Sequence, residues 1–156
     1  MLTDYSILRA LQSEKSIVAK RRFFLAEQPI LAEGATGSFL YLIESGRVRI
    51  TTRIELKGRR HIRPGLRDLG PGDVLGELAL FDDAPQITSA VTVEDTELLE
   101  FEVEDLLAYL DRHPDQGYVF LQRLLQSLTR HLRQADLRLK SLFAWGLEAH
   151  GIDKYL

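Results

Sequence analysis

Short apolar runs separated by turn residues fill the segment from about residue 23 to residue 104. The clearest runs are rich in β-branched, aromatic or leucine side chains and are divided by glycine or proline: Phe39–Ile43, Val48–Thr52, Val74–Leu75, Ala90–Val93 and Leu98–Phe101. Several short strands at such spacing are typical of an antiparallel barrel or jelly roll. The pattern therefore predicts a mainly β fold, with helices before and after the strands.

Two further segments complete the predicted β region and its N-terminal flank. Residues 53–67 are interpreted as a hairpin with a basic tip at Lys57-Gly58-Arg59-Arg60, whose charge is ordinary solvated surface. Residues 3–20 have a weak amphipathic pattern that predicts one or two short helices. The apolar positions of that pattern are Ile7, Leu8, Leu11, Ile17 and Val18.

Helical periodicity replaces the strand pattern after residue 103. Val103-Glu104-Asp105 opens a short helix that His113-Pro114 ends, and a long helix is expected from about residue 116 to residue 143. Along it, leucine and alanine recur at alternating spacings of four and three: Leu121, Leu125, Leu128, Leu132, Ala135, Leu139 and Leu142. These seven residues are called the heptad seam below.

The length of this helix indicates how the heptad seam is used. About 26 residues span ~39 Å, which is longer than a small barrel is wide. The second half of the seam is therefore predicted to form a homodimeric coiled coil. The first half has additional apolar residues at Phe120 and Leu124. The alternative for this half is that it packs against the barrel of its own chain. The tail, residues 146–156, is expected to leave the helix at Gly146.

Composition limits the classes of protein to consider. The chain has 156 residues, is 45% hydrophobic and has a net charge of −3, so no global charge draws it to nucleic acid or an anionic membrane. It has no cysteine, which excludes disulfides and thiolate metal sites. No apolar run approaches the ~20 residues of a membrane-spanning helix, and no secretory signal is evident. A cytoplasmic location without membrane association is expected.

Four stretches, in order, resemble the cyclic nucleotide-binding domain family, which includes the sensor halves of catabolite activator and fumarate–nitrate regulators. They are Leu31–Gly34 with Gly37 and Phe39–Ile43, then Ser45–Ile50, then Gly70–Leu80, and finally Glu94–Leu99. The resemblance covers roughly residues 20–140. It implies a jelly-roll β-barrel at about 22–103 within one domain, residues 1–145, and a C-terminal helix that pairs in a dimer.

The resemblance also implies a ligand cassette that begins at Gly76-Glu77-Leu78-Ala79. Backbone N–H groups at a helix start favour an anion such as a cyclic phosphate, and Gly76 allows a close approach. In the family, the glutamate of this motif accepts a hydrogen bond from a ribose hydroxyl, which assigns that role to Glu77. The alternative is that Glu77 is a first-turn carboxylate that stabilises the short helix.

The cassette departs from the family where an arginine normally meets the phosphate. Counting from Glu77 places Gln86 there, and a register shifted by one places Ile87 there. Gln86, Thr88 or Ser89 can still donate neutral hydrogen bonds. On the long helix, Ala135 and Asp136 replace the family's small hydroxyl residues. His131 is a candidate ligand residue near Glu77, with an exposed helix histidine as the alternative.

These departures leave two functions in competition. The first is a stand-alone, homodimeric sensor that binds cyclic AMP or cyclic GMP weakly. The second is a ligand-free domain that acts as a dimerisation or protein-docking module for an unidentified partner. Catalysis and a resident cofactor or metal are not expected, because the histidines are scattered: His61, His113, His131 and His150. Direct DNA binding is not expected, because about a dozen residues follow Trp145.

Overall fold

The structure is a computed structural model that describes residues 6–11, 19–81, 83–152 and 154. These residues form two compact units, one up to Phe120 and one from Leu121 onward. The first unit contains every strand together with α1 (Ser6–Leu11), η1 (Glu77–Leu80) and α2 (Val103–Arg112). The last helix, α3 (Pro114–Ala149), begins in the first unit and makes up most of the second.

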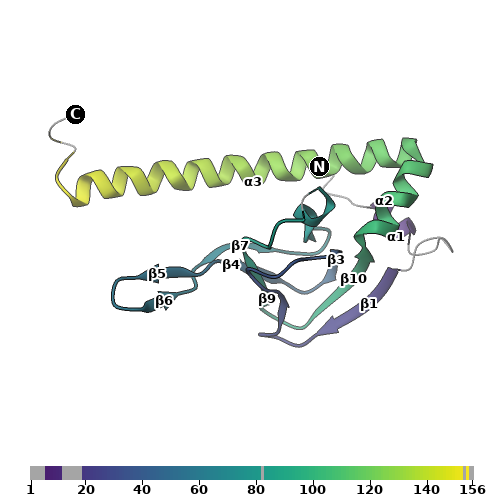
Figure 1. The fold of residues 1–156 in the computed structure, drawn as a ribbon, viewed down its shortest axis with the longest axis horizontal. Coiled ribbons are helices and arrows are strands. Elements are labelled where there is room, and N and C mark those ends of the chain that lie inside the picture. Colours follow the sequence, from purple (N-terminus) through teal and green to yellow (C-terminus); the bar gives the residue numbers. More distant parts are fainter. Residues whose placement is uncertain (1–5, 12–18, 82, 153, 155–156) are drawn as a thin grey trace. The chain divides into compact units, whose positions relative to one another are not determined.

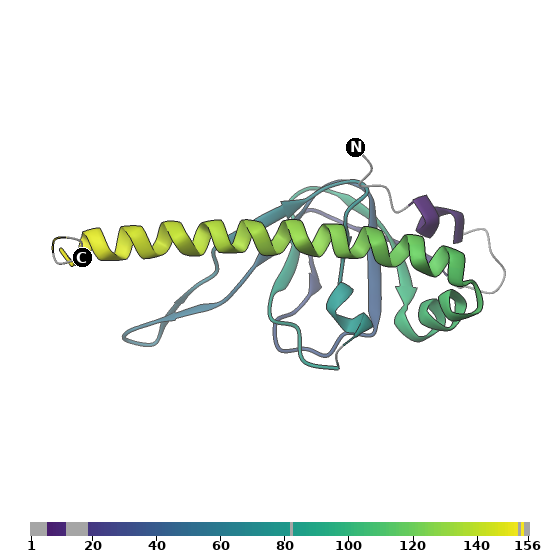
Figure 2. The ribbon, with the colours of Figure 1, turned by 90° about the horizontal axis from the view of Figure 1, so that it is seen from above.

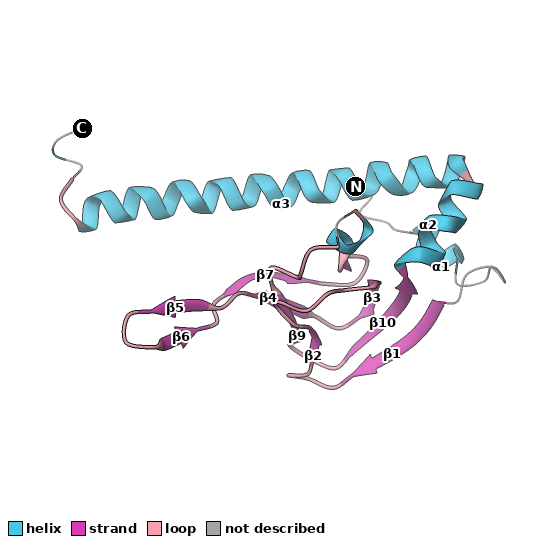
Figure 3. Ribbon diagram, in the orientation of Figure 1, coloured by secondary structure: helices cyan, strands magenta, loops and turns pink. Residues whose placement is uncertain are grey.

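Two four-stranded antiparallel sheets make up the β region (Figures 1 and 3). One has the order β1 (Ala19–Phe24), β10 (Thr96–Glu102), β3 (Phe39–Ser45), β8 (Val74–Leu75). The other has the order β2 (Pro29–Leu31), β9 (Ser89–Thr92), β4 (Val48–Thr51), β7 (Gly65–Leu69). Neighbouring strands that are distant in sequence, such as β10 and β3, give the crossed connections of a jelly roll. The predicted fold class is confirmed.

The core forms where the inner faces of the two sheets meet. Tyr41, Ile43 and Leu98 from the first sheet pack in one cluster with Val48 and Ile50 from the second, all at most 7% exposed. Because side chains alternate across a strand, the core residues of β3 and of β4 are two positions apart in the sequence. Leu40, Leu42, Leu99 and Phe101 lie between them and are also buried, on the other face of the first sheet. The first sheet is thus covered on both faces.

The hairpin predicted at residues 53–67 is present as β5 (Ile54–Leu56) and β6 (Arg60–Ile62). It extends away from the two larger sheets (Figures 1 and 2). Gly58 and Arg59 at its tip both have positive φ angles, 84° and 60°. A tight turn between twisted strands needs such angles, and glycine adopts them without steric cost.

Two elements at the start of the chain differ from expectation. The structure adds β1 and β2, which the apolar pattern did not predict. Strand β1 has the sequence Ala-Lys-Arg-Arg-Phe-Phe and lies at a sheet edge, where charged residues are favoured because they discourage further strand pairing. Of the helices predicted for residues 3–20, the structure contains α1. Ile17 and Val18, which also belong to the predicted pattern, lie outside the described part of the chain.

The helix after α2 is longer than predicted. It begins at Pro114, a favoured first position because proline has no N–H to leave unpaired, and it continues to Ala149 without a break (Figure 2). Gly146 does not end it, since a single glycine costs only about 1 kcal/mol in a helix. The end comes at Gly151, where φ is 65° and the N–H groups of Gly151 and Ile152 donate to the carbonyls of Glu148 and Leu147. This pair of bonds is a Schellman motif.

Along the heptad seam, most of the apolar side chains face solvent. Leu125, Leu132 and Leu142 are 64–67% exposed, whereas Phe120 and Leu124 are buried. Within the described residues, no helix combines the length and apolarity needed to cross a bilayer.

Candidate functional site

The cassette, residues 76–89, begins with a glycine that the backbone itself requires. Gly76 has φ 81° and ψ 11°, and it precedes the single 3-10 turn η1. A Cβ atom added to Gly76 would lie 2.5 Å from the carbonyl oxygen of Phe39 on β3. Glycine at this position is therefore explained by the close approach of β3, before any ligand is considered.

The short helix predicted to hold an anion is a single turn. Its four residues, Glu77–Leu80, form one 3-10 turn, in which the N–H of Ala79 donates to the carbonyl of Gly76 and that of Phe81 to Leu78. So short an element has little macrodipole. The start of η1 therefore offers little attraction to an anion, and the side chains around the turn become more important.

Glu77 is the buried ionisable group of this turn, with 9% of its surface exposed. Burial raises the pKa of the Glu77 carboxyl above its ordinary value of 4.5. Its own backbone N–H and the charge of Arg67 lower that pKa in part, but burial is the larger cause. A carboxylate that served only to stabilise the first turn would be expected at the surface. The burial of Glu77 therefore favours a role inside the barrel over the structural alternative.

Gln86 is also buried, with 8% of its surface exposed, and its backbone is fixed to the loop after β2. Its N–H donates to the carbonyl of Ala35, and its carbonyl accepts from Gly34. The side-chain Nε2 lies 2.7 Å from where a Cβ on Gly37 would be. The loop that contains Gly34 and Gly37 is thus held against the cassette by Gln86.

The other predicted cassette residues face in several directions. Leu78 and Ile87 are exposed, at 44% and 67%, while Ala79 and Thr88 are half-buried. Ser89 alternates along β9 with the core residue Ala90, so its side chain lies on the opposite face of that strand. The hydroxyl oxygen of Ser89 accepts a hydrogen bond from the N–H of Glu33 at 3.0 Å.

The structure therefore groups Glu77 and Gln86 as the buried polar residues among the predicted ligand contacts. His131 is half-buried on α3 in the second unit, and its role as a ligand residue stays a prediction. The sequence reasoning missed Arg67 on β7, whose charge acts on Glu77. Among the described residues there is no group of three or more His, Cys, Asp or Glu side chains that could hold a metal ion.

Comparison with known proteins identifies the family. The model of the cyclic nucleotide-binding domain matches residues 21–113. The cyclic AMP receptor protein of Thermus thermophilus is 42% identical over 123 residues, which are 79% of this chain and 53% of that protein. The chain thus spans about half the length of this curated relative.

Solved structures agree with the sequence comparison. The Thermus thermophilus catabolite activator protein superposes with a TM-score of 0.63 at 40% identity, over 80% of this chain and 55% of that one. A cyclic nucleotide-binding domain from Methylobacillus flagellatus superposes with a TM-score of 0.70 at 28% identity, over 79% of this chain and 67% of that one. At the level of the family, these relatives indicate a regulatory and non-enzymatic domain. The chain belongs to the cyclic nucleotide-binding domain family.

Proposed function

We propose that this chain is a homodimeric sensor domain that binds a cyclic nucleotide in its barrel. The observation that supports this most directly is the burial of Glu77 at the start of the cassette, with a raised carboxyl pKa. Burying an ionisable group costs folding free energy, and such groups occur preferentially at functional sites. In this proposal the Glu77 carboxylate accepts a hydrogen bond from the ribose.

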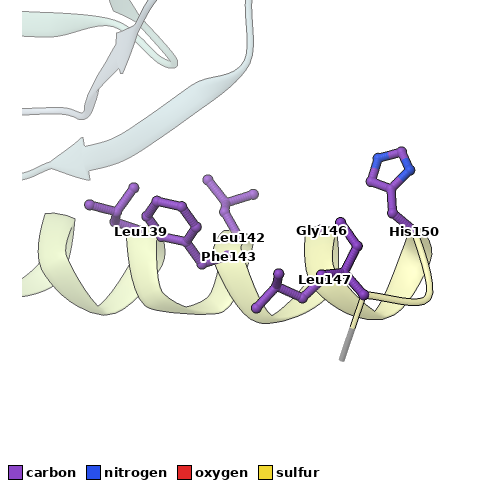
Figure 4. Close-up of a pocket in the computed structure, with 7 residues that line it drawn as sticks. Leu139, Leu142, Phe143, Gly146, Leu147 and His150 are labelled. Atoms are coloured by element: carbon purple, nitrogen blue, oxygen red, sulfur yellow. The ribbon is translucent and has the colours of Figure 1, made fainter. Parts of the chain in front are cut away.

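Dimerisation is proposed through the heptad seam on α3. The exposed leucines of the seam repeat at coiled-coil spacing, and at the C-terminal end of α3 they adjoin a wider apolar surface. There, Leu139, Leu142, Phe143, Gly146, Leu147, His150 and Ile152 line an apolar hollow of about 340 Å³ (Figure 4). A contiguous apolar surface of this kind is expected to be covered by another protein surface. A second copy of α3 fits it, because the seam is complementary to itself.

The second candidate function is a ligand-free docking module. It is favoured by Gln86, which gives the cassette a neutral side chain where the family has an arginine. The main chain of Gln86 is hydrogen-bonded to Ala35 and Gly34, so this position also holds the loop after β2. In this alternative, the barrel is a rigid support and the apolar surface of α3 binds a different protein.

Calorimetric titration and thermal unfolding with cyclic AMP and with cyclic GMP distinguish the two functions. A ligand at 100 times its dissociation constant stabilises the folded state by about 2.7 kcal/mol. For a chain of this length that raises the unfolding midpoint by roughly 5–10 °C. Adenosine 5′-monophosphate, which lacks the cyclic phosphodiester, is the control. If neither cyclic nucleotide binds at millimolar concentration, the sensor function is wrong and the docking module is preferred.

A further inference from the structure

Arg67 lies on the inner face of β7, because it is opposite the core residue Ile50 and two positions before the core residue Leu69. In the β4–β7 register, Ile50 is opposite Arg67 and Thr51 is opposite Gly65, so Leu66 is the extra residue. A bulge of this kind disturbs the alternation of side chains and can re-aim them. Leu66 packs against the same core cluster as Leu69, two positions beyond Arg67. The inner face of β7 thus holds Leu66, Arg67 and Leu69.

The opposite face of the same strand shows where an ordinary surface charge would lie. Asp68, between Arg67 and Leu69, points outward and receives two hydrogen bonds from Arg49 on β4, at 2.8 and 2.9 Å. Both of these side chains are substantially exposed. Arg67 therefore differs from Asp68 and Arg49 in direction as well as in burial.

The Arg67 side chain has hydrogen-bonding capacity to spare. Its Nε atom is buried and has no hydrogen-bond partner among the residues that the structure describes. An unsatisfied buried donor costs stability, and each such group needs an explanation. The charge of Arg67 also lowers the pKa of the buried Glu77 carboxyl, so the two groups lie near each other. A ligand with an acceptor oxygen at this place would satisfy the donor.

The charges in the site favour a phosphate as that ligand group. A cyclic nucleotide has one negative charge on its phosphodiester, and in a barrel that also contains Glu77 that charge needs a cation. Residues 76–89 include no lysine or arginine. Arginine is suited to the task because its planar fork can donate two parallel hydrogen bonds to phosphate oxygens.

We infer that Arg67 is the residue that binds the phosphate of the nucleotide in this barrel, from β7 instead of from the cassette. This inference rests on the proposed sensor function. It places the cation of the site on a strand where the sequence resemblance assigns no ligand contact. Gln86 is then free to hold the loop of Gly34 and Gly37.

The test compares Arg67→Gln and Arg67→Lys with the wild-type chain by calorimetric titration of cyclic AMP and cyclic GMP. Because both nucleotides share the phosphate and differ in the base, Arg67→Gln should weaken both at least tenfold and by similar factors. Arg67→Lys keeps the charge but not the planar fork, so its affinities should lie between those of the wild type and Arg67→Gln. Arg49→Gln removes the same charge from the outer face of the sheet and should leave both affinities unchanged.

Each result decides the inference. Equal affinities for wild type and Arg67→Gln would overturn it while leaving the sensor function intact. A loss confined to one nucleotide would assign Arg67 to the base and overturn the phosphate contact. If the wild-type chain binds neither nucleotide, the sensor function is wrong and this inference is wrong with it.

A second measurement avoids dependence on a variant that fails to fold. In nitrogen–proton spectra of the wild-type protein, the Nε–H signal of Arg67 should move when either nucleotide is added. The signal is assigned in the wild-type protein by correlating the side-chain Nε–H with the backbone signals of Arg67. A signal that stays in place at saturating nucleotide would overturn the inference.

Discussion

Gly76 lies so close to Phe39 that any side chain at position 76 would collide with the backbone of β3. The added Cβ would be 2.5 Å from the Phe39 carbonyl oxygen, and the φ angle of Gly76 is 81°. We therefore expect Gly76→Ala to destabilise the fold by about 2–4 kcal/mol, combining the strain of a positive φ with the collision. Urea unfolding measures the loss.

The control for this variant is Gly58→Ala in the β5–β6 hairpin. Gly58 has a similar φ of 84°, but a Cβ there would meet nothing within 4 Å. Gly58→Ala should therefore lower the free energy of unfolding only by the strain of the φ angle, about 1 kcal/mol. Equal losses for the two variants would show that the contact with Phe39 is not the reason for glycine at position 76.

Glu77→Gln should stabilise the ligand-free protein at neutral pH, because it removes the cost of a buried charge. The pKa of Glu77 is raised in the folded state, so the favourable contribution of the protonated carboxyl is present below pH 4.5 and is lost as the pH rises through the raised value. The advantage of the variant should accordingly be greatest above that raised value and shrink toward pH 4.5. Denaturant unfolding at a series of pH values measures it.

Glu94→Gln is the matched control for Glu77→Gln, since Glu94 is exposed. It should have little effect on stability at any of these pH values. A Glu77→Gln variant that is less stable than wild type at pH 7 would mean that the ionised carboxylate is a net stabilising group, contrary to the burial argument.

Leu139→Gln should weaken self-association through the heptad seam. In a dimer, Leu139 would be buried once in each chain, so the substitution would remove about 3 kcal/mol of binding free energy in total. That loss corresponds to a rise of roughly a hundredfold in the dissociation constant. Leu137→Gln is the control, because Leu137 is similarly exposed, at 60%, but lies outside the seam. Sedimentation measures both. A wild-type chain that stays monomeric at high concentration, or equal effects of the two variants, would contradict a dimer through this seam.

Gln86→Arg should raise the affinity for cyclic AMP at least tenfold, because it adds a charged donor at the cassette position where the family has one. Ile87→Arg is the control and also tests the neighbouring register. Since Ile87 is 67% exposed, an arginine there should leave the affinity unchanged. Calorimetric titration compares the two. An increase for Ile87→Arg alone would show that the register with Gln86 is wrong.

The sequence was sufficient to locate strands where apolar residues alternate. It failed to locate elements whose position depends on residues distant in the chain. Strands β3 and β4 were predicted within two residues because their buried positions follow the period of a strand. The edge strand β1, which is rich in basic residues, gave no such signal. The end of α3 was placed too early because Gly146 and Gly151 look alike in sequence, and only the second adopts a positive φ.

The candidate site was harder to predict than the fold. Gly76 and Glu77 were found through the motif, but the reason for the glycine is the nearness of Phe39, which no local pattern contains. Arg67 was missed because the sequence pattern assigned residues 53–67 to a hairpin, whereas Arg67 lies in β7, two positions before the core residue Leu69.

The exposed leucines of α3 have a consequence for how the protein responds to its own abundance. A lone helical segment in water is only marginally stable, and most helices are held by the packing of one apolar face. From Leu132 to Leu142 the seam leucines of α3 face solvent. In the proposed dimer, forming the last turns of α3 and pairing two chains would be a single equilibrium. The C-terminal turns should fray in dilute solution and become ordered as the protein accumulates.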